Sequence, residues 1–137
     1  MQAPRVPSDL AGLTRTLTDP DPVLRGMAAL ALRDMGPAAA PALPALAAAL
    51  RDPDTGVRMT AADAIARQGK AAVSVLDALL TAARNPQEHV HVQRSLALAF
   101  AAIGPAAAPA IPILHQMEAV PRVRFTAATA IRRITEK

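Results

Sequence analysis

Apolar positions recur along the chain at the three- and four-residue spacing of amphipathic helices, in two alternating kinds of segment. The first kind, the A segments, predicts helices at about residues 21–35, 54–68, 88–103 and 121–135. The second kind, the B segments, predicts helices at about residues 7–18, 41–51, 71–84 and 109–118. Their order along the chain is B-A-B-A-B-A-B-A, so we expect an all-α protein of about eight helices.

The two kinds of segment repeat with a fixed period. DPDPVLRGMAALALRDMG, which begins at Asp19, aligns with DPDTGVRMTAADAIARQG 33 residues later. A third copy lies 35 residues after the second, with two residues inserted near 87–91, and a fourth lies 66 after the second. Such a period is typical of a solenoid, in which each unit packs on its neighbours. We therefore predict a single domain over residues 1–137, a right-handed α-solenoid of stacked antiparallel helix pairs, with units at roughly 7–36, 37–69, 70–104 and 105–137.

Small and large residues occupy fixed columns of the repeat. Two columns of the A segments are Ala in every copy, at positions 29, 62, 97, 128 and at positions 31, 64, 99, 130. A third column is Leu, Ile, Phe and Ile, at positions 32, 65, 100 and 131. Ala columns allow close approach of two helix backbones, and the large column fills the space between layers. In the B segments, Leu10, Leu43, Leu76 and Ile111 predict a buried column.

The segment boundaries carry their own signals. Asp21-Pro22 and Asp52-Pro53-Asp54 place a capping carboxylate beside a proline, as at the start of a helix. Gly36, Gly69 and Gly104 follow the A segments, where a helix commonly ends on a left-handed residue. Pro44 and Pro112 lie inside B segments, so those helices either begin near residues 43 and 111 or bend.

The amino-acid composition limits the kinds of core and of binding site that the chain can form. Hydrophobic residues make up 52% of the 137, but only two are aromatic, which predicts a thin core of small side chains. The absence of cysteine excludes disulfides and thiolate metal sites. We expect no apolar run of the roughly 18 residues that span a membrane. The N-terminal MQAPRVPSDL lacks the apolar region of a secretion signal, so a cytoplasmic location is expected. The net charge of +4 permits an acidic partner.

The pattern DPDxxVRxxAAxALxxxG, followed by PALPAL, resembles HEAT repeats and is similar to the short bacterial HEAT-like type associated with phycobilisome lyases. The residues that carry it are Asp52-Pro53-Asp54, Val57-Arg58, Ala61-Ala62, Ile65, Gly69 and, in the first copy, residues 41–46. The resemblance implies a structural ladder in which Arg25 and Arg58 bridge to loop carboxylates such as Asp19 and Asp52. The third copy has Asn85-Pro86-Gln87 and Gln93 instead, so the ladder is expected only between the first two units.

Candidate catalytic and metal-binding residues are few. The metal candidates are Glu88, His89, His91 and His115. On a helix, His89 and His91 would point about 200° apart. Deoxyhypusine hydroxylases, which are HEAT-like enzymes, hold iron with His-Glu pairs in successive repeats, whereas here Glu88-His89 has the reverse order and occurs once. His115 shares a column with Ala47 and Leu80 and is expected to be partly buried.

The serines add no catalytic pair. Ser74 has no histidine at helical spacing, and His91, four residues before Ser95, is not repeated in the other copies as a base would be in a repeated site. We therefore expect no cofactor, no metal and no enzymatic activity.

The function expected is that of a non-catalytic scaffold or adaptor for a protein partner. In HEAT-like proteins the B helices usually line the concave face, and here their outward positions are small, nearly uncharged and without aromatics. The partner-binding residues predicted are Arg15, Ser74, Asp77, Thr81, His89, His91, Ile113 and Gln116. Nucleic-acid binding through the Arg-rich edges is the main alternative. A bilin-lyase subunit is a third hypothesis, which rests on the resemblance alone.

The ends of the solenoid are a second candidate interface. Val123, Phe125, Ile131 and Ile134 on the last helix are expected to be partly exposed. Such an end suits docking of a partner or self-association with a second copy.

Overall fold

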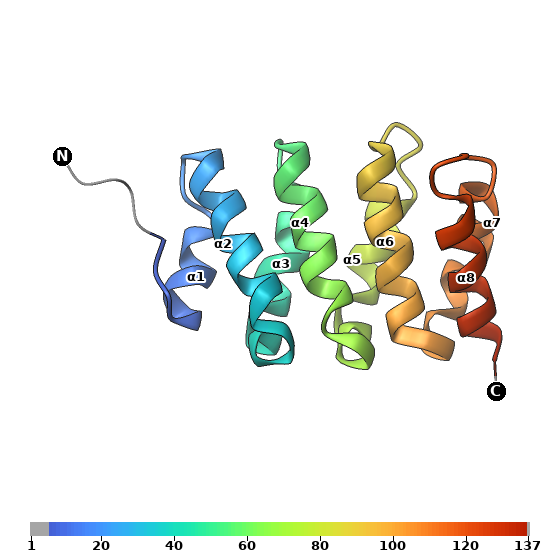
Figure 1. Cartoon of the computed structure of the whole chain (residues 1–137), viewed down its shortest axis with the longest axis horizontal. Helices are drawn as coiled ribbons and strands as arrows, with labels where there is room; N and C mark the ends of the chain where they lie inside the picture. The colour runs from blue at the N-terminus through green and yellow to red at the C-terminus, as the bar shows by residue number, and fades with distance from the viewer. Residues whose placement is uncertain (1–5, 137) are drawn as a thin grey trace.

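The computed structural model describes residues 6–136, which form a stack of helices in two rows without a strand among them (Figure 1). The A row consists of α2 (Pro22–Met35), α4 (Thr55–Ala66), α6 (Val90–Ile103) and α8 (Arg124–Thr135). The B row consists of α1 (Leu10–Thr16), α3 (Leu43–Ala49), α5 (Leu76–Ala83) and α7 (Ile111–Met117). This arrangement is an all-helical solenoid, as the sequence period predicts.

Three 3₁₀ segments connect the A row back to the B row. They are η1 (Gly36–Ala42), η2 (Gly69–Val75) and η3 (Gly104–Ala110). Because η1 joins α2 directly to α3, η2 runs directly into α5 and η3 joins α6 directly to α7, residues 6–136 contain six uninterrupted helical segments. The prediction of about eight separate helices is wrong in this respect, since the expected loops are themselves helical.

The helix ends follow the capping signals in the sequence. Asp21 caps α2 by accepting a hydrogen bond from the Val23 amide at 2.9 Å, and Asp54 caps α4 by accepting one from the Val57 amide at 3.0 Å. At the opposite ends Gly36, Gly69 and Gly104 have φ of +60°, +59° and +79°. A Cβ atom at any of these glycines would meet nothing within 4 Å, so the backbone conformation alone requires glycine there.

The prolines of the B row decide between the two alternatives that the sequence left open. Helices α3 and α7 begin at Leu43 and Ile111, so Pro44 and Pro112 occupy the second helical position, where no intrahelical N–H bond is lost. The B helices are therefore shorter than the periodicity indicates and are preceded by 3₁₀ turns.

The core lies between the two rows and between successive A helices. Ala29, Ala62 and Ala97 are fully buried, and Phe100 is the largest of the fully buried side chains. Val123 and Ile134, which were expected to be partly exposed, are buried because η3 and α7 pack against α8. Of the four side chains predicted to be exposed on the last helix, Phe125 is 85% exposed and Ile131 is half-buried.

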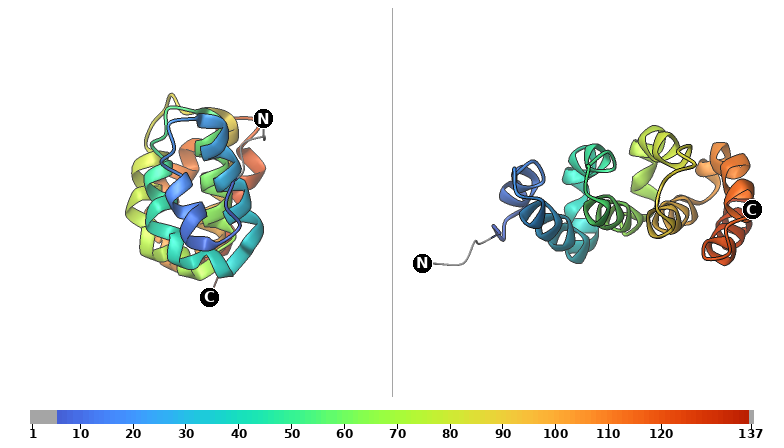
Figure 2. Two further views of the ribbon diagram at one scale, coloured as in Figure 1. Left: turned by 90° about the vertical axis from the view of Figure 1, so that its left-hand side faces the viewer. Right: turned by 90° about the horizontal axis from the view of Figure 1, so that it is seen from above.

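Successive A helices pack closely along the stack, whereas successive B helices are more widely separated. Viewed from above, both rows bow in the same direction, with the A row on the inner side of the curve (Figure 2). The expectation that the B helices line the concave face is therefore wrong. The Ala columns are the physical reason, because they bring the A helices together on the inner side.

One continuous helical stretch, Val90–Met117, is long and apolar enough to cross a membrane by length and composition, and an 18-residue window within it has a mean hydropathy of 1.8. The expectation that no such apolar run exists is wrong. This stretch comprises α6, η3 and α7, and its apolar side chains include Leu96, Phe100 and Leu114, which are fully buried in the core. The packing of the repeat thus accounts for its composition.

Candidate functional site

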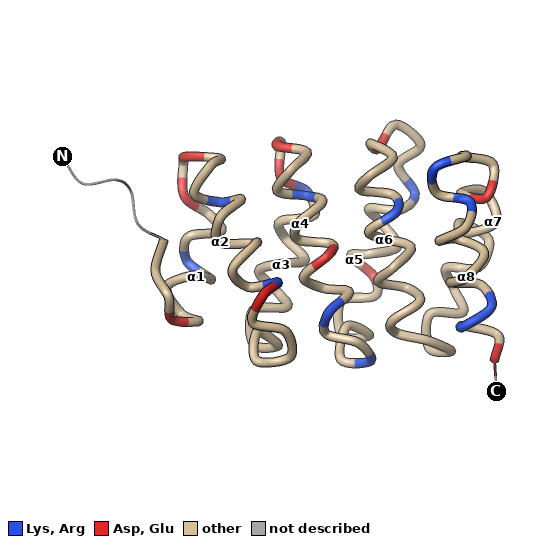
Figure 3. The backbone as a smooth tube through the Cα atoms, viewed as in Figure 1, with Lys and Arg blue, Asp and Glu red and all other residues tan. Residues whose placement is uncertain are grey.

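Charged residues are frequent in the loops that lead into the A helices (Figure 3). At the first of these loops, Arg25 of α2 reaches forward to the next repeat. Its Nε and Nη2 donate to the two carboxylate oxygens of Asp52 at 2.7 and 3.1 Å. Its Nη1 donates back to the carbonyl oxygen of Asp19 at 2.9 Å. One guanidinium therefore holds the loop of its own repeat and the loop of the next repeat.

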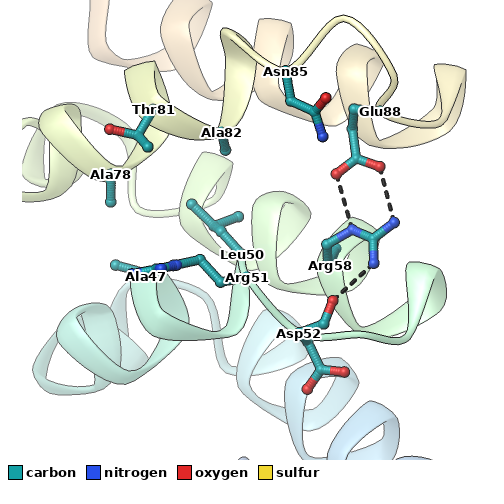
Figure 4. A pocket seen from close by; sticks show the side chains of 10 residues that line it. All are labelled: Ala47, Leu50, Arg51, Asp52, Arg58, Ala78, Thr81, Ala82, Asn85 and Glu88. Carbon is teal, nitrogen blue, oxygen red and sulfur yellow. Dashed lines mark hydrogen bonds and ion pairs between the residues drawn. The ribbon is translucent and has the colours of Figure 1, made fainter.

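The same arrangement recurs one repeat further along (Figure 4). Arg58 Nε and Nη2 donate to Glu88 Oε2 and Oε1 at 2.9 and 3.0 Å, and its Nη1 donates to the Asp52 carbonyl at 2.7 Å. We call this set of contacts a rung: an arginine donates to the carboxylate of the next repeat and to a backbone carbonyl in the loop of its own repeat. The two rungs are Arg25–Asp52 and Arg58–Glu88.

The predicted ladder is corrected in two respects. The Asp19 carboxylate does not contact Arg25, because Arg25 Nε and Nη2 donate forward to Asp52. The Asp19 carboxylate instead accepts the Asp21 amide at 2.8 Å. The ladder also extends into the third unit, because Glu88 supplies the carboxylate that the Asn85-Pro86-Gln87 loop lacks. Glu88 lies three residues beyond Asn85, within the two-residue insertion, and its longer side chain reaches Arg58. The signal available in the sequence was an acidic residue in the inserted segment.

The backward contact of the rung persists in the units that lack the forward contact. Gln93, at the arginine position of the third unit, donates through Nε2 to the Glu88 carbonyl at 2.8 Å. Arg124, at this position in the fourth unit, donates through Nε to the Glu118 carbonyl at 3.1 Å. The residue at this position therefore anchors the loop that precedes each A helix.

The electrostatics of the rungs favour the ionised pair. The hydrogen bond that Arg25 donates to Asp52 raises the pKa of Arg25, and the one that Arg58 donates to Glu88 raises the pKa of Arg58, so both guanidiniums remain charged. The carboxylates are shielded from solvent, with 7% of the Asp52 side chain and 6% of the Glu88 side chain exposed. These groups are fully engaged with one another, which suits loop positioning rather than proton transfer.

A groove of about 510 Å³ lies between α3 and α5, with the second rung at one end (Figure 4). It is lined on the helices by Ala47, Ala78, Thr81 and Ala82, and by Arg51 and Asn85 at the helix ends. It lies where the two B helices separate on the outer side of the stack. Thr81 is the predicted binding residue that faces this groove.

The predicted binding residues do not form one site. Arg15, Ser74, Asp77, Thr81 and Gln116 are exposed, but only Ser74, Asp77 and Thr81 share a unit, the third, with Ser74 in η2 and the other two in α5. Asp77 and Thr81 are adjacent, because the Thr81 hydroxyl donates to the Asp77 carbonyl at 2.9 Å. Ile113 is buried, with 9% exposed, and is wrong as a binding residue because it packs into the core of the last unit.

The histidines adopt an arrangement that helical spacing did not predict. His89 is the N-cap of α6 and precedes the helix, so its ring stacks on His91 with centroids 5.1 Å apart rather than pointing away. The expected 200° separation is therefore wrong. His115 is exposed rather than partly buried, and its Nδ1 lies 2.8 Å from Glu118 Oε1. Within residues 6–136, no three His, Cys, Asp or Glu side chains converge as a metal site would require.

An apolar surface on the inner face of the A row was missed by sequence reasoning. It consists of Val23, Met27 and Leu30 on α2, exposed by 65%, 44% and 42%, together with the half-buried Met59 on α4. We call these four residues the inner apolar patch. They line a groove of about 410 Å³ between the two helices. The equivalents of the three α2 residues in the second unit are Gly56, Thr60 and Asp63, and this contrast was visible in the sequence.

The rungs, the paired helices and the glycine turns define a helical repeat protein. A family model for HEAT repeats matches residues 10–97, and the chain belongs to this family. No curated protein matches the chain.

Solved structures share the fold. One engineered protein matches with a TM-score of 0.76 and 21% identity over 91% of this chain and 62% of the other. A second matches with a TM-score of 0.73 and 24% identity over 93% and 38%. Human deoxyhypusine hydroxylase in complex with glycerol matches with a TM-score of 0.69 and 26% identity over 98% and 46%. The chain thus spans 38–62% of the length of these structures.

Proposed function

We propose that the chain is a non-catalytic protein-interaction module that binds an apolar helix of a partner on its inner apolar patch. The observation that carries this proposal is the exposure of three large apolar side chains, Val23, Met27 and Leu30, on one face of α2. Contiguous apolar surface of this kind marks interaction sites on folded proteins.

The groove beside the patch has the shape and chemistry for a helix. The exposed Val23 and the glycines Gly26 and Gly56 leave a shallow channel between α2 and α4. Met27 and Met59 supply flexible side chains that adapt to an apolar partner. An amphipathic helix laid into such a groove presents anchors at helical spacing. Membership of the HEAT repeats family supports the role of a repeat scaffold.

Selection from a library of displayed helical peptides tests this function. We expect peptides with an apolar stripe, and we expect Val23→Glu and Met27→Glu each to weaken their binding by about tenfold or more, because a desolvated charge would lie against the stripe. Leu98→Glu is the matched control, because Leu98 is 42% exposed on α6 but does not line this groove. Selected peptides that bind both patch variants as tightly as the wild type would refute the proposal.

A second candidate function is nucleic-acid binding, which is favoured by a basic groove at the edge of the stack opposite the rungs. Lys70, Arg132 and Arg133 line a cavity of about 530 Å³ together with Glu136. A salt titration of DNA binding separates the two functions, because phosphate contacts give affinity that falls steeply with salt. Binding lost in Arg132→Glu and retained in Val23→Glu would favour this second function.

A further inference from the structure

Each end of the described stack carries half of a rung. Arg124 occupies the position of Arg25 and Arg58, yet no carboxylate among residues 6–136 forms an ion pair with it. Asp19 occupies the position of Asp52, and among these residues its carboxylate accepts a hydrogen bond only from the Asp21 amide. A donor thus lies at the α8 end and an acceptor at the α1–α2 end.

The apolar columns are incomplete at the α8 end. Ala62 and Ala97 are fully buried, whereas Ala128 in the same column is exposed. Ile65 and Phe100 are fully buried, whereas Ile131 in the same column is only half-buried. Positions that are buried in every unit but the last face the following unit. Ala128 and Ile131 therefore form the surface on which a further A helix would pack.

The columns that face the preceding unit are incomplete at the other end. Val57 and Val92 are 1% exposed, whereas Leu24 in their column is half-buried. Ala64, Ala99 and Ala130 are fully buried, and Ala31 is the half-buried member of that column. Leu24 and Ala31 therefore form the surface on which a preceding A helix would pack.

The two ends also complement each other in the order of their helices and in the sign of their charges. The stack begins with a B helix, α1, and ends with an A helix, α8, so a second copy placed beyond α8 continues the alternation of the rows. In that register the cationic Arg124 meets the anionic Asp19 of the second copy, as Arg25 meets Asp52 within one chain. Another copy of this chain therefore satisfies the columns and the half-rung together.

We propose that copies of the chain associate head to tail, with Arg124 of one copy forming a rung to Asp19 of the next. Ala128 and Ile131 pack against Leu24 and Ala31 across this interface. The contact is heterologous, so it propagates into rings or filaments rather than closing a twofold dimer. It uses the ends of the stack and leaves Val23 and Met59 uncovered, so this proposal and the proposed peptide binding can fail independently.

A charge-swap experiment tests the rung. Sedimentation velocity of the wild type should show a mean mass that rises with concentration from the micromolar to the near-millimolar range. Arg124→Glu alone and Asp19→Arg alone should each weaken association by about tenfold or more, because like charges then face each other across the interface. An equal mixture of the two variants should restore association, since every contact between unlike variants pairs opposite charges.

Two controls keep the test decisive. Arg84→Glu and Asp77→Arg change charge at exposed positions away from both ends and should associate as the wild type does. Ala128→Arg, at an exposed position, should abolish association with no loss of helicity by circular dichroism. A wild type that stays monomeric would overturn the proposal, as would folded charge-swap variants whose mixture fails to associate.

Discussion

At the scale of single residues, Glu88 shows that the rung requires a carboxylate oxygen at a place in space rather than an acid at a place in the sequence. The Asp52 carboxylate lies at the start of its loop, whereas Glu88 lies at the end of a longer loop, yet both accept the same two donors of an arginine. The longer glutamate side chain spans the distance that the inserted residues add. The loop sequence can therefore vary while the contact persists.

The second rung predicts the effect of neutralising Glu88. Glu88→Gln should destabilise the fold by about 1–3 kcal/mol, because the Arg58 guanidinium loses its charged partner in a shielded position. Glu136→Gln is the matched control and should change stability little, because Glu136 is exposed and its carboxylate forms no hydrogen bond within the described residues. The measurement is the midpoint of urea unfolding followed by circular dichroism. Equal midpoints for the two variants would contradict the role of the rung.

At the scale of elements, the A helices form the centre of the core and the B helices pack against it. The large column of the A row is filled by Leu32, Ile65 and Phe100, each fully buried against the neighbouring layers. The Ala columns beside it let these helices approach so closely that a single aromatic ring fills the space in the third unit. The stack thus depends on few large side chains.

The two phenylalanines of the chain test this dependence. Phe100→Ala should destabilise the protein by about 3–5 kcal/mol, because it leaves a cavity in a core built of small residues. Phe125→Ala removes the same atoms from a side chain that is 85% exposed and should change stability by less than about 0.5 kcal/mol. Thermal unfolding of both variants at the same concentration gives the comparison. A small loss for Phe100→Ala would show that the layers collapse onto the cavity.

The helices could be predicted from the sequence more completely than the exposed surfaces. The columns predicted both rows and most of the buried positions of the A row, because periodicity reports which side of a helix is covered. The predicted buried column of the B row is wrong at Leu10, Leu76 and Ile111, which are half-buried, and right at Leu43. The 3₁₀ turns at Gly36 and Gly104 were missed, since glycine and proline indicate a break in an α-helix but leave the conformation of the next residues undetermined.

The candidate site was predicted less completely, for reasons of three-dimensional geometry. The Arg25–Asp52 contact follows from the period, but the Arg58–Glu88 contact depends on how the longer loop folds. The direction of the curve depends on the relative spacing of the two rows, which column patterns alone do not determine. Val23 was not predicted as a binding residue, because the B row was expected to form the concave face.

At the scale of the whole molecule, stability is distributed along one dimension, because each unit contacts chiefly its immediate neighbours. Hydrogen exchange at low protein concentration should therefore be slowest in α4 and α6, which have an A helix on each side, and fastest in α1, which lies at an end and is seven residues long. Peptide-resolved mass spectrometry measures this order. Uniform protection from α1 to α8 would instead indicate a single cooperative unit.

The position of the rungs also has a mechanical consequence. Both rungs lie at the loops before α4 and α6, along one edge of the stack, and fix the spacing of successive units there. At the other edge, the described residues provide a single side-chain hydrogen bond between successive units, from Gln68 to the Gly36 carbonyl at 2.8 Å. Ion pairs therefore hold the units along one border, whereas packing of the 3₁₀ segments, η2 on α6 and η3 on α8, holds them along the other. Salt screens the first kind of contact and not the second, so rising ionic strength should loosen the charged border first.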